Sequence, residues 1–317
     1  MLQAFVDKPA RQDAWEIKFD EKSWDLKEPQ EVKLVESGPV RATVQVKHKF
    51  QNSTIVQEIN LYAGVPRVDI NMHVDWHEHH ILLKAAFAAD VQSNFATYEI
   101  PYGAIQRPTT RNTPAEQAKF EVPALRWGDL SDATHGFSLL NASKYGYDAK
   151  ANVIRLSLLR SATYPNGRED DPAAVTDQGM HDFTYALYPH TGDWKAGNTM
   201  QQGYELNYPM IPISASLHDG SLPAQHSFVN IEPNNVILTV IKKSEDRDSL
   251  ILRFYEFTGQ QSQVRLRLPE KAVRAFETNL MEKQEHEIAL EAGGRELVVP
   301  TGPYEIKTVE VSFSAQP

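Results

Sequence analysis

The stretch RVDINMHVDW, residues Arg67 to Trp76, places an apolar side chain at every second position. These apolar residues are Val68, Ile70, Met72, Val74 and Trp76. Successive side chains of a β-strand point to opposite faces, so the alternation predicts a strand with one buried and one solvated face. The stretch VRATVQVKHKF, which begins at Val40, alternates in the same way. Such segments predict an all-β protein with large antiparallel sheets packed as a sandwich.

Later segments extend this pattern to a second, smaller sandwich. Residues 213–228 are rich in small and turn-forming residues, and five short runs of strand-like composition follow them. We therefore predict a β super-sandwich domain over residues 1–218 and a small C-terminal β-sandwich domain over residues 219–317. Only Thr113 to Phe120 predicts a helix, because Thr113 can cap it and Pro114 suits its first position.

Composition excludes several classes of function. The 317-residue chain has a net charge of -10, whereas a general nucleic-acid binder needs a basic surface. It has no cysteine, which removes disulfides and thiolate chemistry and favours a reducing, cytoplasmic location. No apolar run is long enough to span a membrane, so neither membrane nor nucleic acid is expected as a partner. The N-terminal residues MLQAFVDKPARQDAW are typical of folded sequence, and we expect them to lie inside a longer protein.

The segment from Asn71 to His80 holds four histidines, an aspartate and a glutamate, which are residue types that bind zinc. On a strand, His73, Asp75 and His77 share one face at intervals of about 6.6 Å, so two histidines could reach one metal ion. A solvated strand face that ends in a turn explains the same pattern, and no helical HExxH motif is present. We favour the solvated strand and expect no metal in this chain.

Four long motifs stand out beyond these patterns: VDWHEHHILLKAAF, EIPYGAIQRPTTRNT, HGFSLLNASKYGYDAKANVIRLSLLRSATYP and DQGMHDFTYALYPH. They resemble the C-terminal β-region of glycoside hydrolase family 38 α-mannosidases, and the resemblance extends over nearly the whole chain. It implies a large super-sandwich similar to that of galactose mutarotases, followed by a smaller β-sandwich. It also implies that the catalytic aspartate and the zinc site lie in an N-terminal domain absent from this chain.

The resemblance therefore implies a supporting function. The chain would hold its partner, the missing catalytic domain, and complete the sugar pocket in which terminal α-mannosyl bonds of mannose-containing glycans are hydrolysed. No catalytic residue is expected in this chain, and the chain alone is expected to be inactive.

The resemblance places Arg160 at the end of a strand that lends an arginine to the rim of the family's active site. A guanidinium group can donate two hydrogen bonds to neighbouring sugar hydroxyls. The alternative is a structural pair with Asp177 or Asp182. Asp13 and Trp15 are further candidates, since an aromatic face packs on a pyranose ring and a carboxylate accepts from hydroxyls, although such a tryptophan is often part of the core. Asp177, in the polar loop after Arg160, completes the set of substrate-binding candidates.

Two other functions remain open. A stand-alone carbohydrate-binding module needs an exposed aromatic platform, for which the candidates are Trp15, Trp127 and Trp194. An independent enzyme of mutarotase type needs a histidine and a glutamate that converge. The candidates are His73 or His135 with Glu99 or Glu121. The loop Thr163–Gly179 is long enough to be functional. A fragment without its partner domain is also expected to expose an apolar sheet face.

Overall fold

The computed structural model describes residues 1–18, 22–164 and 172–314. The chain divides into two compact units, Met1–Ile100 with Ile105–Met210 and Pro101–Ala104 with Ile211–Pro317. The boundary expected from composition, 218/219, lies in the coil that follows Met210. The regular secondary structure of both units is almost wholly antiparallel strand, which confirms the all-β prediction. Within the described ranges, no helix is long and apolar enough to cross a membrane.

The larger sheet of the first unit has nine strands and contains the segment with the clearest alternation. In spatial order the strands are β3 (Glu31–Ser37), β4 (Arg41–Phe50), β5 (Ser53–Tyr62), β6 (Val68–Trp76), β15 (Gly179–Thr191), β12 (His135–Asn141), β11 (Trp127–Ser131), β8 (Phe95–Ile100) and β9 (Gly103–Pro108). On β6, Met72, Val74 and Trp76 are fully buried while His73 is exposed. The period of two in the sequence therefore does separate a core face from a solvated face.

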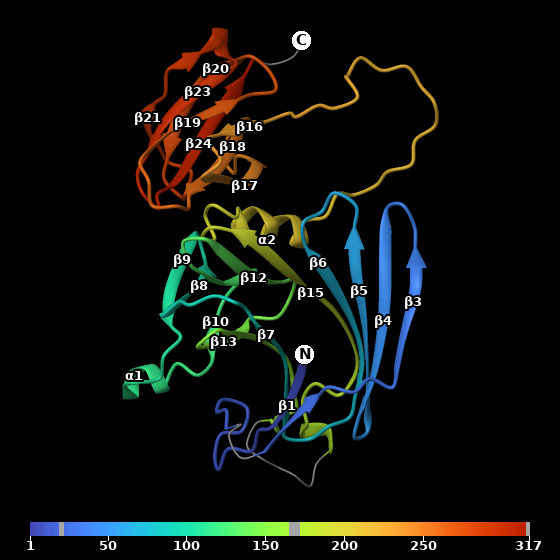
Figure 1. Cartoon of the computed structure of the whole chain (residues 1–317). Coiled ribbons are helices and arrows are strands. Elements are labelled where there is room, and N and C mark those ends of the chain that lie inside the picture. The colour runs from blue at the N-terminus through green and yellow to red at the C-terminus, as the bar shows by residue number, and fades with distance from the viewer. Residues whose placement is uncertain (19–21, 165–171, 315–317) are drawn as a thin grey trace. The chain divides into compact units, whose positions relative to one another are not determined.

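The smaller sheet of the first unit has six strands. Their order is β10 (Val122–Pro123), β13 (Gly146–Lys150), β14 (Val153–Arg160), β7 (Ile81–Ala88), β1 (Leu2–Val6) and β2 (Ser23–Leu26). Leu83 and Ile154 from this sheet share one apolar core with Ile55, Trp76 and Tyr185 from the larger sheet. The two sheets therefore form the layers of a sandwich, with β7 and β13 in one and β4 to β6 in the other (Figure 1).

Helix α1 (Pro114–Gln117) confirms the helix predicted from sequence. The hydroxyl of Thr113 accepts a hydrogen bond from the backbone N–H of Glu116 at 3.2 Å, as the capping pattern requires. Two short 3-10 helices, η1 (Pro172–Ala174) and η2 (Ala292–Gly294), complete the minor elements.

Helix α2 (Thr199–Asn207) was not predicted, because its sequence carries no start signal. Its N-cap, Asn198, has a left-handed backbone (φ 53°) and makes no side-chain capping bond. The helix packs on β11 instead: a Cβ atom added at Gly203 would lie 3.0 Å from Cδ1 of Trp127. A tertiary contact, rather than capping or helix propensity, therefore accounts for its position.

The second unit is the smaller sandwich. One sheet has the order β16 (Asn230–Glu232), β19 (Ser262–Arg267), β23 (Glu296–Thr301) and β22 (Leu290–Glu291). The other has the order β17 (Val236–Lys243), β18 (Leu250–Glu256), β24 (Ile306–Phe313), β20 (Ala272–Thr278) and β21 (Gln284–Glu287). Val264 and Leu297 of the first sheet share a core with Leu252, Phe254 and Val309 of the second.

The first unit also exposes apolar side chains at one edge of its larger sheet. Val32 and Leu34 of β3 are 58% and 65% exposed, and Leu61 of β5 is 55% exposed. The sequence analysis expected a broad apolar sheet face of a fragment without its partner domain, whereas these three side chains lie on two strands near one edge.

Candidate functional site

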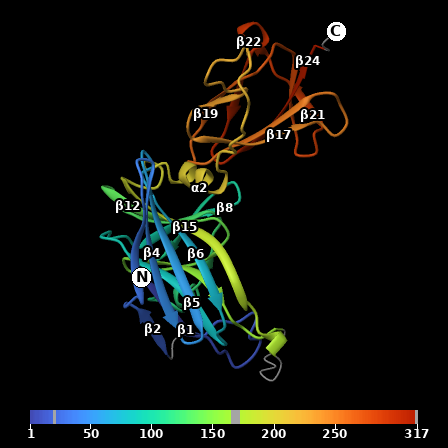
Figure 2. The same ribbon diagram turned by 90° about the vertical axis from the view of Figure 1, so that its right-hand side faces the viewer.

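The structure brings together the four residues that sequence reasoning proposed for sugar binding. Arg160 is the last residue of β14, Asp13 and Trp15 lie in the loop after β1, and Asp177 precedes β15. The Nη2 atom of Arg160 donates to the carbonyl of Asp13 at 2.7 Å, and its backbone N–H donates to Asp177 Oδ2 at 3.0 Å. In Figures 1 and 2 the loop after β1 lies beside the chain that leads into β15. One end of the first unit therefore carries the candidate site.

The guanidinium group of Arg160 binds several groups of the loop after β1. Its Nε atom donates to Asp7 Oδ2 at 2.5 Å, and Nη1 donates to the carbonyl of Ala14 at 3.2 Å. Nη2 also donates to the carbonyl of Glu16. The other oxygen of Asp7, whose side chain is 1% exposed, accepts the backbone N–H of Lys18 at 2.7 Å. Four of the five N–H groups of the guanidinium thus bind protein, and both ends of the loop are fixed to it.

The expected structural alternative for Arg160 named the wrong carboxylates. The guanidinium pairs with Asp7, which sequence reasoning missed. Asp177 instead accepts from the backbone N–H of Arg160, and Asp182 lies 2.5 Å from His73 Nδ1. Because Asp7 and Arg160 are 153 residues apart, no local signal connects them.

Asp13 has a buried carboxylate with one oxygen in use and one without a partner. Its Oδ2 atom accepts the backbone N–H and the hydroxyl of Thr163, both at 2.6 Å, and lies 3.4 Å from His80 Nδ1. Its Oδ1 atom is buried and has no hydrogen-bond partner within the described residues. A buried carboxylate oxygen without a donor is costly, and the two bonds from Thr163 to the other oxygen hold this carboxylate in the loop.

Trp15 and Tyr164 form an exposed aromatic pair above these polar groups. Their side chains are 63% and 58% exposed, and their ring centroids are 5.8 Å apart with an interplanar angle of 41°. Tyr164 was not proposed from the sequence, although it stands four residues after Arg160. An exposed aromatic pair beside hydrogen-bonding groups suits a sugar ring, whose C–H face packs on aromatic carbon.

Three residues around this site have a left-handed backbone conformation, which residues other than glycine rarely adopt. They are Gln12 (φ 53°), His80 (φ 53°) and Asp177 (φ 54°). The carbonyl of Gln12 accepts the backbone N–H of Trp15 at 2.8 Å, and that of His80 accepts the N–H of Asp7 at 2.7 Å. Such conformations persist where surrounding contacts fix them, and they are frequent at functional sites.

The three-tryptophan platform expected of a stand-alone binding module is wrong. Trp127 and Trp194 are 0% and 6% exposed, and their ring centroids are 5.1 Å apart. They belong to the packing between β11 and the chain around α2 and cannot contact a ligand at the surface. Of the three, Trp15 alone faces solvent.

The histidine-rich segment forms separate ion pairs. His73 Nδ1 lies 2.5 Å from Asp182 and its Nε2 lies 3.7 Å from Glu58, while His77 Nε2 lies 2.7 Å from Asp75. Among residues 1–18, 22–164 and 172–314, no three His, Asp or Glu side chains are arranged so that they could hold a metal ion. His73 and His77 thus each pair with carboxylates of their own.

The histidine–glutamate pair needed by a mutarotase-type enzyme is also not formed. Glu99 pairs with Arg126 and Glu121 pairs with Lys84, and burial raises the pKa of both carboxyl groups. His135 lies 3.5 Å from Asp132 instead. Each glutamate thus pairs with a cation, and Glu121 shares Lys84 with Asp148, as is typical of structural ion pairs.

A buried serine, histidine and aspartate meet behind α2, but they do not form a nucleophilic triad. Ser138 Oγ donates to Asp129 Oδ2 at 2.7 Å, and His190 Nε2 lies 2.8 Å from the same oxygen. Thr199 of α2 lies 2.7 Å from Ser138 Oγ. In a triad one ring nitrogen of the histidine faces the serine and the other faces the aspartate. Here the same atom, His190 Nε2, lies 2.8 Å from Asp129 Oδ2 and 3.1 Å from Ser138 Oγ. The cluster joins β11, β12, β15 and α2.

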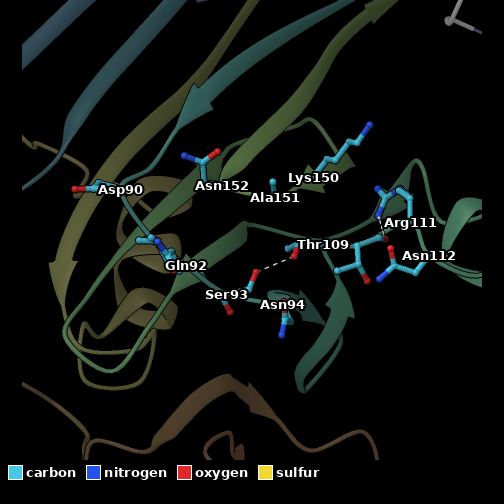
Figure 3. A pocket seen from close by; sticks show the side chains of 12 residues that line it. Asp90, Gln92, Ser93, Asn94, Thr109, Arg111, Asn112, Lys150, Ala151 and Asn152 are labelled. Carbon is cyan, nitrogen blue, oxygen red and sulfur yellow. Dashed lines mark hydrogen bonds between the residues drawn. The ribbon is translucent and has the colours of Figure 1, made fainter.

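The first unit has an open cleft of about 710 Å³ that sequence reasoning did not foresee. It is lined by three loops, residues 90–94, 109–112 and 150–152, and Figure 3 shows their polar side chains. Within it, the hydroxyl of Thr109 donates to the carbonyl of Ser93 at 2.8 Å. None of its lining residues belongs to the Arg160 site.

Two family models match this chain. The model described as "Glycosyl hydrolases family 38 C-terminal domain" matches residues 1–168, and "Glycosyl hydrolases family 38 C-terminal beta sandwich domain" matches residues 235–309.

Curated relatives agree with these matches. The human protein named "Alpha-mannosidase 2C1" is 36% identical over 270 residues, which cover 84% of this chain and 25% of the relative. "Alpha-mannosidase G" of Dictyostelium discoideum is 35% identical over 261 residues, which cover 78% of this chain and 23% of the relative. The chain thus spans about a quarter of the length of these relatives.

A crystal structure of an α-mannosidase from Enterococcus faecalis V583 has the same fold. It superposes with a TM-score of 0.81 over 98% of this chain and 38% of that chain. Its sequence identity of 16% extends the similarity to the fold alone.

Proposed function

Because this chain belongs to glycoside hydrolase family 38, as part of the family's C-terminal region, we propose that it is the non-catalytic β portion of an α-mannosidase. In this proposal it supports a catalytic domain and completes the pocket for a terminal α-mannosyl residue of a mannose-containing glycan. The proposed location of the complete enzyme is the cytoplasm.

One observation carries the pocket proposal: Arg160 fixes a loop whose tip presents Trp15 beside Tyr164. The exposed rings offer an apolar surface to the C–H face of a sugar, while the buried carboxylate of Asp13 holds the loop through Thr163. Since most of the guanidinium donors already bind the loop, Arg160 acts here chiefly as a positioning residue.

The reaction itself is assigned to the catalytic domain. Retaining glycosidases hold a nucleophile and an acid about 5–5.5 Å apart, and we assign no such pair to this chain. Asp177 and Asp182 bind different partners, the backbone N–H of Arg160 and the ring of His73. Zinc is likewise proposed to bind in the catalytic domain, because His73 and His77 of this chain each pair with carboxylates.

The pocket proposal is tested with an aryl α-mannoside and the full-length enzyme. Trp15→Ala removes the exposed ring, which is 63% exposed. Tyr145→Ala is the control, because Tyr145 is an aromatic residue of similar exposure, 58%, that lies outside the site. An aromatic contact contributes about 0.5–1.5 kcal/mol, so Trp15→Ala should lower kcat/KM roughly two- to tenfold. Equal kcat/KM for the two variants would refute a sugar contact at Trp15.

A further inference from the structure

The chain that connects the two units has an unusual combination of length and form. Residues 208–229, here called the connector, join α2 to β16 and contain no helix or strand. Figure 1 draws the connector as plain coil. The side-chain hydrogen bonds found within it are local, from Ser227 to the carbonyl of Val229 and between His218 and the carbonyl of Asp219. Structureless connections of this length are uncommon in compact domains and are often functional.

Its composition does not suit a solvated linker. Seven large apolar or aromatic side chains are more than 60% exposed: Tyr208, Met210, Ile211, Ile213, Leu217, Leu222 and Phe228. Leu217 and Met210 are almost fully exposed to solvent, with exposed fractions of 104% and 96%. Asp219 is the only aspartate, glutamate, lysine or arginine in the segment. Linkers that stay in water are poor in such residues and rich in charge, so this pattern indicates a surface that a partner covers.

The backbone is also prepared for docking in an extended form. Pro209, Pro212 and Pro223 restrict the φ angles of the connector and lack N–H donors. A segment stiffened by proline loses less conformational freedom when it docks, which favours binding through side chains in apolar pockets.

We propose that the connector docks, through these apolar side chains, on the catalytic domain of the full-length enzyme. The proposal rests on the proposed function, because the occupant is the part of the polypeptide that the longer relatives carry and this chain does not. The apolar edge at Val32, Leu34 and Leu61 is a second bare surface on the same chain, as expected when a large neighbour is missing. The partner surface is therefore apolar and belongs to the same polypeptide.

Hydrogen exchange of the full-length enzyme tests this proposal. The amides of residues 210–228 should exchange at least tenfold more slowly in the full-length enzyme than in the 317-residue chain. Exchange at the rate of an unstructured peptide in the full-length enzyme would overturn the proposal. Equal protection in the isolated chain would overturn it too, because the connector would then dock on this chain or on a second copy.

Matched variants of the full-length enzyme locate the contact. Leu217→Asp places a charge where the apolar contact is proposed, and Ser216→Asp places the same charge on the neighbouring residue. Leu217→Asp should remove the protection and lower Tm, while Ser216→Asp should change both less. Equal effects of the two variants would overturn the assignment of the contact to the apolar side chains.

The two proposals fail separately. Slow exchange at the connector in a full-length protein that does not cleave an aryl α-mannoside would refute the proposed function and leave docking intact. Normal turnover with an unprotected connector would refute docking and leave the function intact.

Discussion

Replacing Arg160 by methionine tests whether this residue is the structural centre of the candidate site. Methionine keeps a long apolar stem but removes the guanidinium, which pairs with Asp7 and donates to three carbonyl groups of the loop. The carboxylate of Asp7, 1% exposed, then stays in place without its cation.

The expected loss of unfolding free energy follows from this geometry. Breaking a buried ion pair from one side costs about 3–5 kcal/mol, because the remaining charge is uncompensated. The 19% exposure of the Arg160 side chain favours the lower end of that range. The double variant Asp7→Asn, Arg160→Met should be more stable than Arg160→Met alone, since it leaves no buried charge.

Urea unfolding of the chain measures these differences, and hydrogen exchange of residues 8–18 reports the loop directly. Arg41→Met is the control, because Arg41 and Glu36 form a pair whose side chains are 38% and 41% exposed. Such surface pairs contribute about 0–1 kcal/mol. The reasoning is refuted if Arg160→Met costs no more than Arg41→Met, or if Asp7→Asn fails to restore any stability.

Three further predictions concern activity, pH and metal. In the full-length enzyme, Arg160→Met should lower kcat/KM roughly tenfold to hundredfold. The reason is that the charged hydrogen bonds that order the aromatic loop contribute about 1.5–3 kcal/mol, which the variant loses. An unchanged kcat/KM would make Arg160 irrelevant to the pocket. Burial lowers the pKa of His190, but the hydrogen bond and charge of Asp129 outweigh it and raise this pKa above 6.5. The stabilisation of the folded state by protonated His190 is complete below pH 6.5 and is lost as pH rises through the raised pKa. The midpoint of urea unfolding should therefore fall as pH rises through this range in the wild type. It should change less with pH in His190→Gln. After dialysis, elemental analysis should find far less than one zinc per chain; about one zinc that disappears on changing His73 and His77 to alanine would contradict this.

Strands such as β6 could be predicted from the sequence because their apolar and polar residues alternate locally, whereas β7 and β11 are buried along consecutive residues. The strand β6 and the helix α1 both follow from patterns within ten residues. Helix α2 could not be predicted in the same way, since its position depends on the contact between Gly203 and Trp127 rather than on a cap.

The candidate site shows the same limit. Arg160, Asp13 and Trp15 were suggested by residue chemistry and by family resemblance. Their convergence required the fold, because the loop after β1 meets the end of β14 only in three dimensions. Burial likewise could not be deduced locally: Trp15 and Trp127 were both candidates for an exposed platform, yet one is exposed and the other is core.

The predicted loop from Thr163 to Gly179 is described only in part. Residues 165–171 lie outside the described residues. The parts that are described contribute Tyr164 and Asp177 to the site.

The most direct test of the central claim compares hydrolysis of an aryl α-mannoside by the purified 317-residue chain and by the full-length enzyme under the same conditions. The account predicts turnover by the full-length enzyme and none above the uncatalysed rate by the chain, because the nucleophile and acid belong to the catalytic domain. Turnover by the chain alone would contradict the account, and so would a correctly folded full-length protein that leaves the substrate intact.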